Sequence, residues 1–248
     1  MKKALAIMSL LLLVGLVGCQ QSTSTSTTPP VPANTCAASV GSLAFTSLYI
    51  DNISLGAVGI TGAMSAQTTL ATPVYGTDGW WSAQFTYGSA AVTVNFRVWN
   101  TSGTEIVNST GLNALTIATT DKLWIYTTWV VGSTTMSFGT SKDNPLKFAG
   151  IYSTSSTNKS ISGPIALSGT DEDGTSYSIA VTYSTVTLSS SGYPNGTVTV
   201  SVTSGGQEIM AGSLVCIGTN SATFTFTSGY SGSYAVNLDT GVVTAASL

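Results

Sequence analysis

The residue types that usually carry out enzymatic catalysis are scarce in this chain of 248 residues. It contains no histidine, so the commonest general base and the Ser-His-Asp arrangement are both missing. The sequence STNK, Ser156 to Lys159, has the Ser-x-x-Lys spacing of some nucleophilic sites. That chemistry needs a helix to bring the lysine beside the serine, whereas this stretch is rich in Ser, Thr and Asn and lies between expected strands. We therefore expect a protein that is not an enzyme.

One acidic cluster, TDEDGT at residues 170–175, could carry other chemistry. Asp171 and Asp173 could supply oxygen ligands to Ca²⁺, but the later ligands of an EF-hand loop are missing. A carboxylate from residues 171–173 could also pair with Glu105 or Glu208 for hydrolysis of a glycoside. An Asp-Gly pair is typical of a hairpin turn, so we expect a polar turn here, with no metal and no cofactor.

Tryptophan is the more informative residue type, with all five copies between residues 80 and 129. Trp99 and Trp124 lie within alternating apolar and polar stretches, which predicts that they belong to the core. Trp80 and Trp81 are adjacent at the start of an expected strand, so they should point to opposite faces of a sheet. We expect at least one of these two to be exposed, where a sugar ring could stack on its indole. They are the ligand-binding candidates, and the alternative is that they form an edge of the core.

The N-terminus predicts the location of the protein. Lys2 and Lys3 precede an apolar run of about 14 residues and then small residues, the layout of a secretory signal peptide. Such a run is short for a membrane span, which needs roughly 20 residues. Leu16-Val17-Gly18-Cys19 resembles the lipobox of bacterial lipoproteins. The resemblance implies cleavage after residue 18 and lipidation of the Cys19 thiol, and in that class Gln20 after the cysteine suggests the outer membrane.

Residues 19–42 are rich in Ser, Thr and Pro and lack charge, which predicts a semi-flexible tether between the lipid and the folded part. The two cysteines beyond Cys19 are Cys36 and Cys216. A pair of cysteines in an exported protein is a disulfide candidate. The alternative is a buried thiol at Cys216.

Charge limits the partners. Without its first 18 residues the chain keeps 5 of its 7 Lys and Arg residues against 10 acidic ones, a net charge of −5. A polybasic footprint is absent, so nucleic acid is not an expected partner. Charged residues make up only 7% of the chain, against roughly 25% in ordinary domains. A surface built from Ser, Thr, Asn and Gly favours contact with neutral partners, meaning glycans, other surface proteins or copies of itself.

The rest of the chain predicts an all-β fold with an internal repeat. Short alternating runs are separated by turn residues, and the clearest is TVTVSVT at 197–203. Residues 43–49 match 146–152, residues 93–106 match 197–209, and two further matched pairs occur in the same order. We therefore predict two tandem, duplicated, antiparallel β-sandwich domains of the Ig-like type, at residues 43–144 and 145–248. Small antiparallel barrels are the alternative.

These observations together predict a non-enzymatic lipoprotein, held in the cell envelope by lipid and facing the periplasm or the exterior. Its expected role is structural or adhesive. A carbohydrate-binding module that uses an exposed tryptophan is the first alternative, and a hydrolase that uses the acidic loop is the second.

Overall fold

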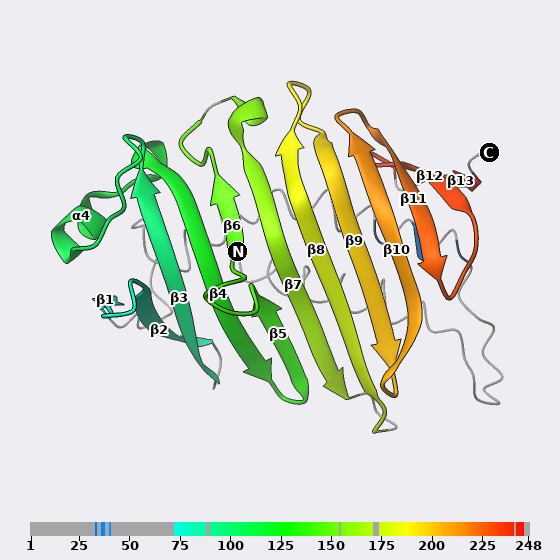
Figure 1. The fold of residues 1–248 in the computed structure, drawn as a ribbon, viewed down its shortest axis with the longest axis horizontal. Helices are drawn as coiled ribbons and strands as arrows, with labels where there is room; N and C mark the ends of the chain where they lie inside the picture. Colours follow the sequence, from blue (N-terminus) through cyan, green and yellow to red (C-terminus); the bar gives the residue numbers. More distant parts are fainter. Residues whose placement is uncertain are drawn as a thin grey trace.

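The protein is all-β in the computed structural model, which describes residues 33, 36–37, 40, 72–87, 90–153, 155–170, 174–240 and 242–245. Within these residues the strands form one antiparallel sheet in the order β1-β2-β3-β4-β5-β7-β8-β9-β10-β11-β12-β13, and β6 pairs with both β4 and β7. Neighbours in the sheet are almost always neighbours in the chain, so the sheet is a long meander (Figure 1).

The elements have the following bounds. The strands of the first half are β1 (Val74–Tyr75), β2 (Trp81–Tyr87), β3 (Ala90–Asn100), β4 (Thr120–Val131), β5 (Thr134–Phe138) and β6 (Leu146–Ala149). Those of the second half are β7 (Ser160–Thr170), β8 (Ser176–Leu188), β9 (Pro194–Ser204), β10 (Gln207–Ile217), β11 (Ser221–Ser228), β12 (Ser233–Asn237) and β13 (Val243–Ala245). The short helices are α4 (Ser109–Ala114), η1 (Ile117–Thr119) and η2 (Ser156–Asn158).

Alternation of apolar and polar residues sets the two faces of the sheet, as the sequence of β9 illustrates. Val198, Val200 and Val202 are buried, whereas the Thr and Ser residues between them are not. Because successive side chains of a strand point to opposite faces, the valines share one face with their partners on β8 and β10. The predicted division of this strand into two faces is confirmed.

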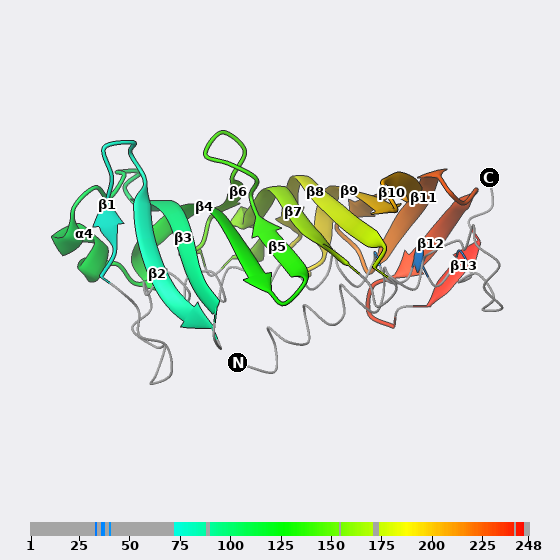
Figure 2. The same ribbon diagram turned by 90° about the horizontal axis from the view of Figure 1, so that it is seen from below.

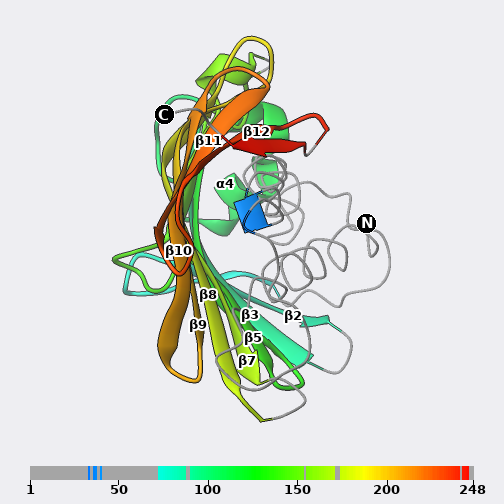
Figure 3. The same ribbon diagram turned by 90° about the vertical axis from the view of Figure 1, so that its right-hand side faces the viewer.

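The hydrophobic core lies on one face of the sheet, which we call the core face. Its largest fully buried side chains come from both halves of the chain and include Trp81, Phe96, Met210 and Phe224. Residues 36, 37 and 40, drawn in blue in Figure 3, belong to the same cluster and lie on this side of the sheet. The opposite face, which we call the outer face, is built mainly from Ser and Thr and is turned toward the viewer in Figure 1.

The prediction of two tandem Ig-like sandwiches is not confirmed, because the sheet continues across the proposed boundary at 144/145. Strand β5 pairs with β7, and β6 fits between β4 and β7. The close approach at Pro145 depends on Gly163, whose φ is +109° and whose added Cβ would lie 2.4 Å from the Pro145 carbonyl oxygen. The edge of the first half is thus joined to the second half by backbone hydrogen bonds.

The predicted disulfide between Cys36 and Cys216 is wrong, because Cys216 has a free thiol. Its position on β10, next to Ala222 of β11, places the side chain on the core face, where it is 2% exposed. The alternation of β10 explains this placement, since Leu214 and Met210 are buried on the same face.

Burial raises the pKa of the Cys216 thiol from 9.0 to about 11. The folded protein therefore keeps this thiol protonated while the unfolded chain ionises, so stability is full below about pH 9 and falls between pH 9 and 11. We expect the wild type to lose on the order of 2 kcal/mol more than Cys216→Ala between pH 8 and pH 11. Urea unfolding of both proteins at the two pH values measures this difference. Equal losses would contradict it, since the cavity in the variant is the same at both pH values.

The signal peptide, Cys19 and most of the predicted tether lie outside the described residues. The described part of the tether, residues 33, 36–37 and 40, is helical, and Cys36, Ala37 and Val40 are buried in the core cluster. The prediction of a flexible tether is therefore wrong for these residues, whose apolar side chains pack against the sheet. None of the helices in the described part of the chain combines the length and hydrophobicity needed to cross a membrane.

Candidate functional site

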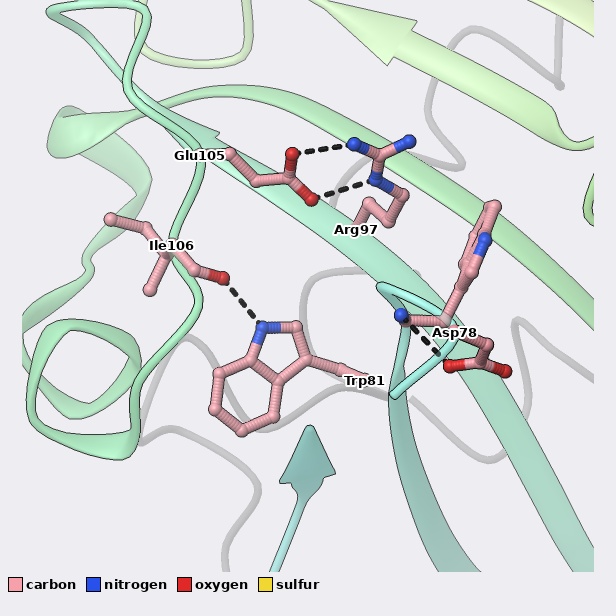
Figure 4. Close-up of polar contacts among 6 residues, drawn as sticks. Asp78, Trp81, Arg97, Glu105 and Ile106 are labelled. Carbon is pink, nitrogen blue, oxygen red and sulfur yellow. Dashed lines mark hydrogen bonds and ion pairs between the residues drawn. The ribbon is translucent and has the colours of Figure 1, made fainter. Parts of the chain in front are cut away.

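The two predicted ligand-binding tryptophans lie on opposite sides of the sheet. Trp81, on the core face, stacks on Phe96 with ring centroids 6.2 Å apart, and its Nε1 donates a hydrogen bond of 2.7 Å to the Ile106 carbonyl oxygen (Figure 4). Trp80 packs edge to face on Tyr126 of β4, with centroids 5.1 Å apart. The prediction of opposite faces is confirmed, but that of exposure is wrong, since Trp80 is 6% exposed and Trp81 2%.

Trp99 and Trp124, which the alternation of their stretches predicts to lie in the core, are instead only partly buried. That prediction is wrong, because Val98 and Leu123 occupy the core face at these points of β3 and β4. The two indoles therefore lie on the outer face, where their ring centroids are 4.8 Å apart at an interplanar angle of 53°. The sequence signal was the alternation along each strand. Trp99 is two residues from Arg97, and Trp124 is two residues from Lys122, so each tryptophan shares its face with a charged residue.

Arg97 anchors this aromatic cluster. Its Cζ lies 5.1 Å from the ring centroid of Trp99, 5.5 Å from that of Trp124 and 5.9 Å from that of Trp80, all within range of cation–π attraction. Glu105 accepts two hydrogen bonds from the guanidinium, 2.7 Å from Nε and 2.5 Å from Nη2 (Figure 4). The Glu105 carboxylate raises the pKa of Arg97 by hydrogen bonding. Arg97 is thus neutralised and held in place, so it supports the indoles.

Two lysines complete the exposed part of the cluster. Lys147 of β6 is the partner of Trp124 in the sheet, and its Nζ lies 4.6 Å from the centroid of that ring. Lys122 of β4 is the partner of Trp99, and its side chain is 46% exposed. We call Trp99, Trp124, Lys122 and Lys147 the aromatic patch.

A turn and a loop border the aromatic patch on the outer face. Asp78, in the turn after β1, forms an ion pair with Lys142, in the loop before β6. The Lys142 ammonium lowers the pKa of Asp78 by hydrogen bonding, and the Trp80 backbone N–H donates to the same carboxylate. Figure 2 shows this turn and this loop rising on the same side of the sheet.

Of the remaining candidates, Asp171, Glu172 and Asp173 lie outside the described residues, so the calcium and hydrolase alternatives stay predictions. In the described part of the chain no three His, Cys, Asp or Glu side chains gather to hold a metal ion. Glu208 accepts hydrogen bonds from Ser201 and Ser228, as expected for a structural carboxylate. Helix η2 ends at Asn158, before Lys159.

Comparison with known protein families, with curated proteins and with solved structures finds no match for this chain. The all-β fold and the aromatic patch are therefore the observations from which a function can be argued. Physically, the patch offers two indoles and two ammonium groups on a face of the sheet whose other residues are mostly hydroxyl-bearing. Such a surface suits a ligand with flat apolar faces and many hydroxyl groups.

Proposed function

We propose that the protein is a lipid-anchored component of the bacterial envelope that adheres to polysaccharide through the aromatic patch. The lipobox supports the anchor, and residues 20–32, which are rich in Ser, Thr and Pro, would link the lipid to the folded part. The role is non-enzymatic and adhesive, and the tryptophans that bind are Trp99 and Trp124 in place of Trp80 and Trp81.

The observation that carries this proposal is the partial exposure of two neighbouring indoles on a polar face. Apolar rings normally turn to the core face, and β3 and β4 have enough Val, Leu, Ile and Phe to fill it. Lys147 and Arg97 lie over the Trp124 ring but leave part of it in water. That exposed part costs free energy, because apolar surface is stabilised by about 25 cal/mol per Å² when removed from water. A sugar ring stacked on the indole would cover it.

We also propose that the sheet arose by internal duplication, although the copies do not close as separate sandwiches. Glu105 hydrogen-bonds Arg97, and Glu208 hydrogen-bonds Ser201. Arg97 and Ser201 occupy equivalent positions in the matched stretches 93–106 and 197–209. Equivalent contacts at equivalent positions support a common origin, and they favour a structural role for both glutamates over a catalytic one.

The experiment is co-sedimentation of the full-length protein, purified in detergent, with a panel of insoluble polysaccharides and with peptidoglycan sacculi. We expect retention on at least one polymer, weakened roughly tenfold by Trp124→Ala, because losing one stacking contact of about 1.4 kcal/mol reduces affinity by that factor. Thr199→Ala is the matched control, since this residue lies on the outer face of β9, away from the patch.

Circular dichroism would establish that the variants are folded. Retention by no polymer, or equal retention of wild type and Trp124→Ala, would overturn the proposal. Sedimentation velocity of the unbound protein would then test the structural alternative, in which copies of the chain associate with one another.

A further inference from the structure

The distribution of positive charge in this acidic chain is uneven. Five Lys and Arg residues follow Cys19, and none follows Lys159, so β7 to β13 contribute no cation to the sheet. Three of the five, Arg97, Lys122 and Lys147, lie on the outer face around Trp99 and Trp124. The aromatic patch is therefore a local concentration of cations on a protein of net negative charge.

The cations of this region differ in how they are neutralised. Arg97 is fully engaged by Glu105, and Lys142 is paired with Asp78. The Lys122 ammonium lies 4.0 Å from an Asp121 carboxylate oxygen, the outer limit of an ion pair. Among the described residues no carboxylate lies within ion-pair distance of Lys147. Two ammonium groups in the patch thus retain most of their capacity to attract an anion.

The position of these two ammonium groups matters as much as their charge. The Lys147 ammonium lies over the partly exposed Trp124 indole, 4.6 Å from its centroid. Lys122 is two residues from Trp124 on β4 and therefore emerges on the same face. A ligand that stacks on the Trp124 indole would meet a cation on β4 and another on β6. A neutral sugar would leave both cations without a counter-charge.

We infer that the ligand of the aromatic patch is an acidic polysaccharide, one whose sugar rings carry carboxylate groups. This inference rests on the proposed function, because it names the chemical class of polymer that the same site binds. The carboxylate of a hexuronic acid is attached directly to its ring, so a ring stacked on an indole brings the anion close to the lysines beside it. Each of two partly exposed ion pairs with the ligand would raise the affinity by up to about fivefold.

The test uses one polymer backbone with and without its charge. Full-length protein in detergent is titrated with polygalacturonate and with a highly methyl-esterified form of the same polymer, whose carboxylates are blocked. We expect roughly tenfold tighter binding of the free acid at low salt. This preference should decline at 0.5 M salt, because screening shortens the Debye length to only a few ångströms.

Variants assign the preference to the patch. We expect Lys122→Gln/Lys147→Gln to remove the preference for the acid form, and Lys122→Arg/Lys147→Arg to retain it. Lys159→Gln, which lowers the net charge outside the patch, should bind both polymers like the wild type. A single-stranded oligonucleotide of similar charge serves as the polyanion control, and it should bind more weakly than polygalacturonate.

The outcomes separate the inference from the proposed function. Equal binding of the two polymers, with loss of both in Trp124→Ala, overturns the acidic ligand and leaves a neutral-glycan module. A preference for the acid that persists in the double glutamine variant also overturns the inference, as does equal binding of the oligonucleotide. Absence of binding to every polysaccharide overturns both.

Discussion

Replacing Trp81 with alanine is expected to lower the free energy of unfolding by about 3–5 kcal/mol, the range for truncating a buried aromatic side chain. Trp81 is 2% exposed and stacks on Phe96 across the β2–β3 pair. Its removal would also leave the Ile106 carbonyl oxygen without the indole hydrogen bond. Chemical denaturation of the purified variant, followed by far-UV circular dichroism, gives the measurement.

The matched control is Trp99→Ala, which removes an indole of the same size from the outer face. We expect it to cost less than half as much, because this side chain is already partly exposed on the outer face and its truncation leaves no closed cavity. Trp81→Phe separates packing from hydrogen bonding, since it retains an aromatic ring but loses the donor to Ile106; a cost of about 1–3 kcal/mol is expected. Equal destabilisation by Trp81→Ala and Trp99→Ala would contradict the division into core face and outer face.

The same division explains what the sequence could predict and what it could not. Alternation with period two identified the strands and, on β9, the valines that are buried. At Trp99 and Trp124 the face of the sheet is decided by alternation along the strand and not by the hydrophobicity of the side chain. Val98 shares the core face with Phe96, so Trp99, the next residue, points to the outer face. Trp124 shares the outer face with Lys122, two residues before it. An aromatic residue in phase with charged residues on two adjacent strands is the sequence signal of an exposed cluster.

The pairing of Cys36 with Cys216 failed for a related reason. An even number of cysteines indicates a possible pair, but the count does not say whether the folded chain brings the two thiols within bonding distance. The apolar run around Cys216 alternates into the core face, and that run was the better predictor.

The number of sheets was the least predictable feature. Repeated sequences encode similar strands, but the edge of a strand pairs through backbone N–H and C=O groups that every residue except proline offers. The sequence of a repeat therefore does not dictate whether its edge strand is capped or joined to the next copy. At the junction between β5, β6 and β7 the decisive features were Gly139 and Gly163, which permit a close approach of backbones that larger residues would block.

This junction leads to the second prediction: the described sheet should unfold as one cooperative unit. All five tryptophans lie between residues 80 and 129, so tryptophan fluorescence reports on the first half of the chain. Far-UV circular dichroism reports on every strand. If β5 and β6 are joined to β7 as described, the two probes should give coincident unfolding curves, the usual test of a two-state transition.

Gly163→Ala tests the junction directly. The substitution forces alanine to adopt a φ of +109° and places its Cβ 2.4 Å from the Pro145 carbonyl oxygen. We expect a loss of about 3 kcal/mol, from backbone strain of roughly 1–3 kcal/mol and the displacement of Pro145. Gly103→Ala is the control, because Gly103 also has a positive φ, +80°, but its added Cβ would meet no atom within 4 Å; it should cost about 1 kcal/mol.

The two probes then discriminate between one sheet and two domains. In a single cooperative sheet, Gly163→Ala shifts the fluorescence and dichroism curves together, although no tryptophan lies beyond residue 129. If residues 43–144 and 145–248 were independent domains, the fluorescence transition would keep its wild-type midpoint while part of the dichroism transition moved to lower denaturant. That result would restore the two-domain organisation that the internal repeat predicts, and it would divide the aromatic patch between the domains, because Lys147 of β6 lies beyond residue 144.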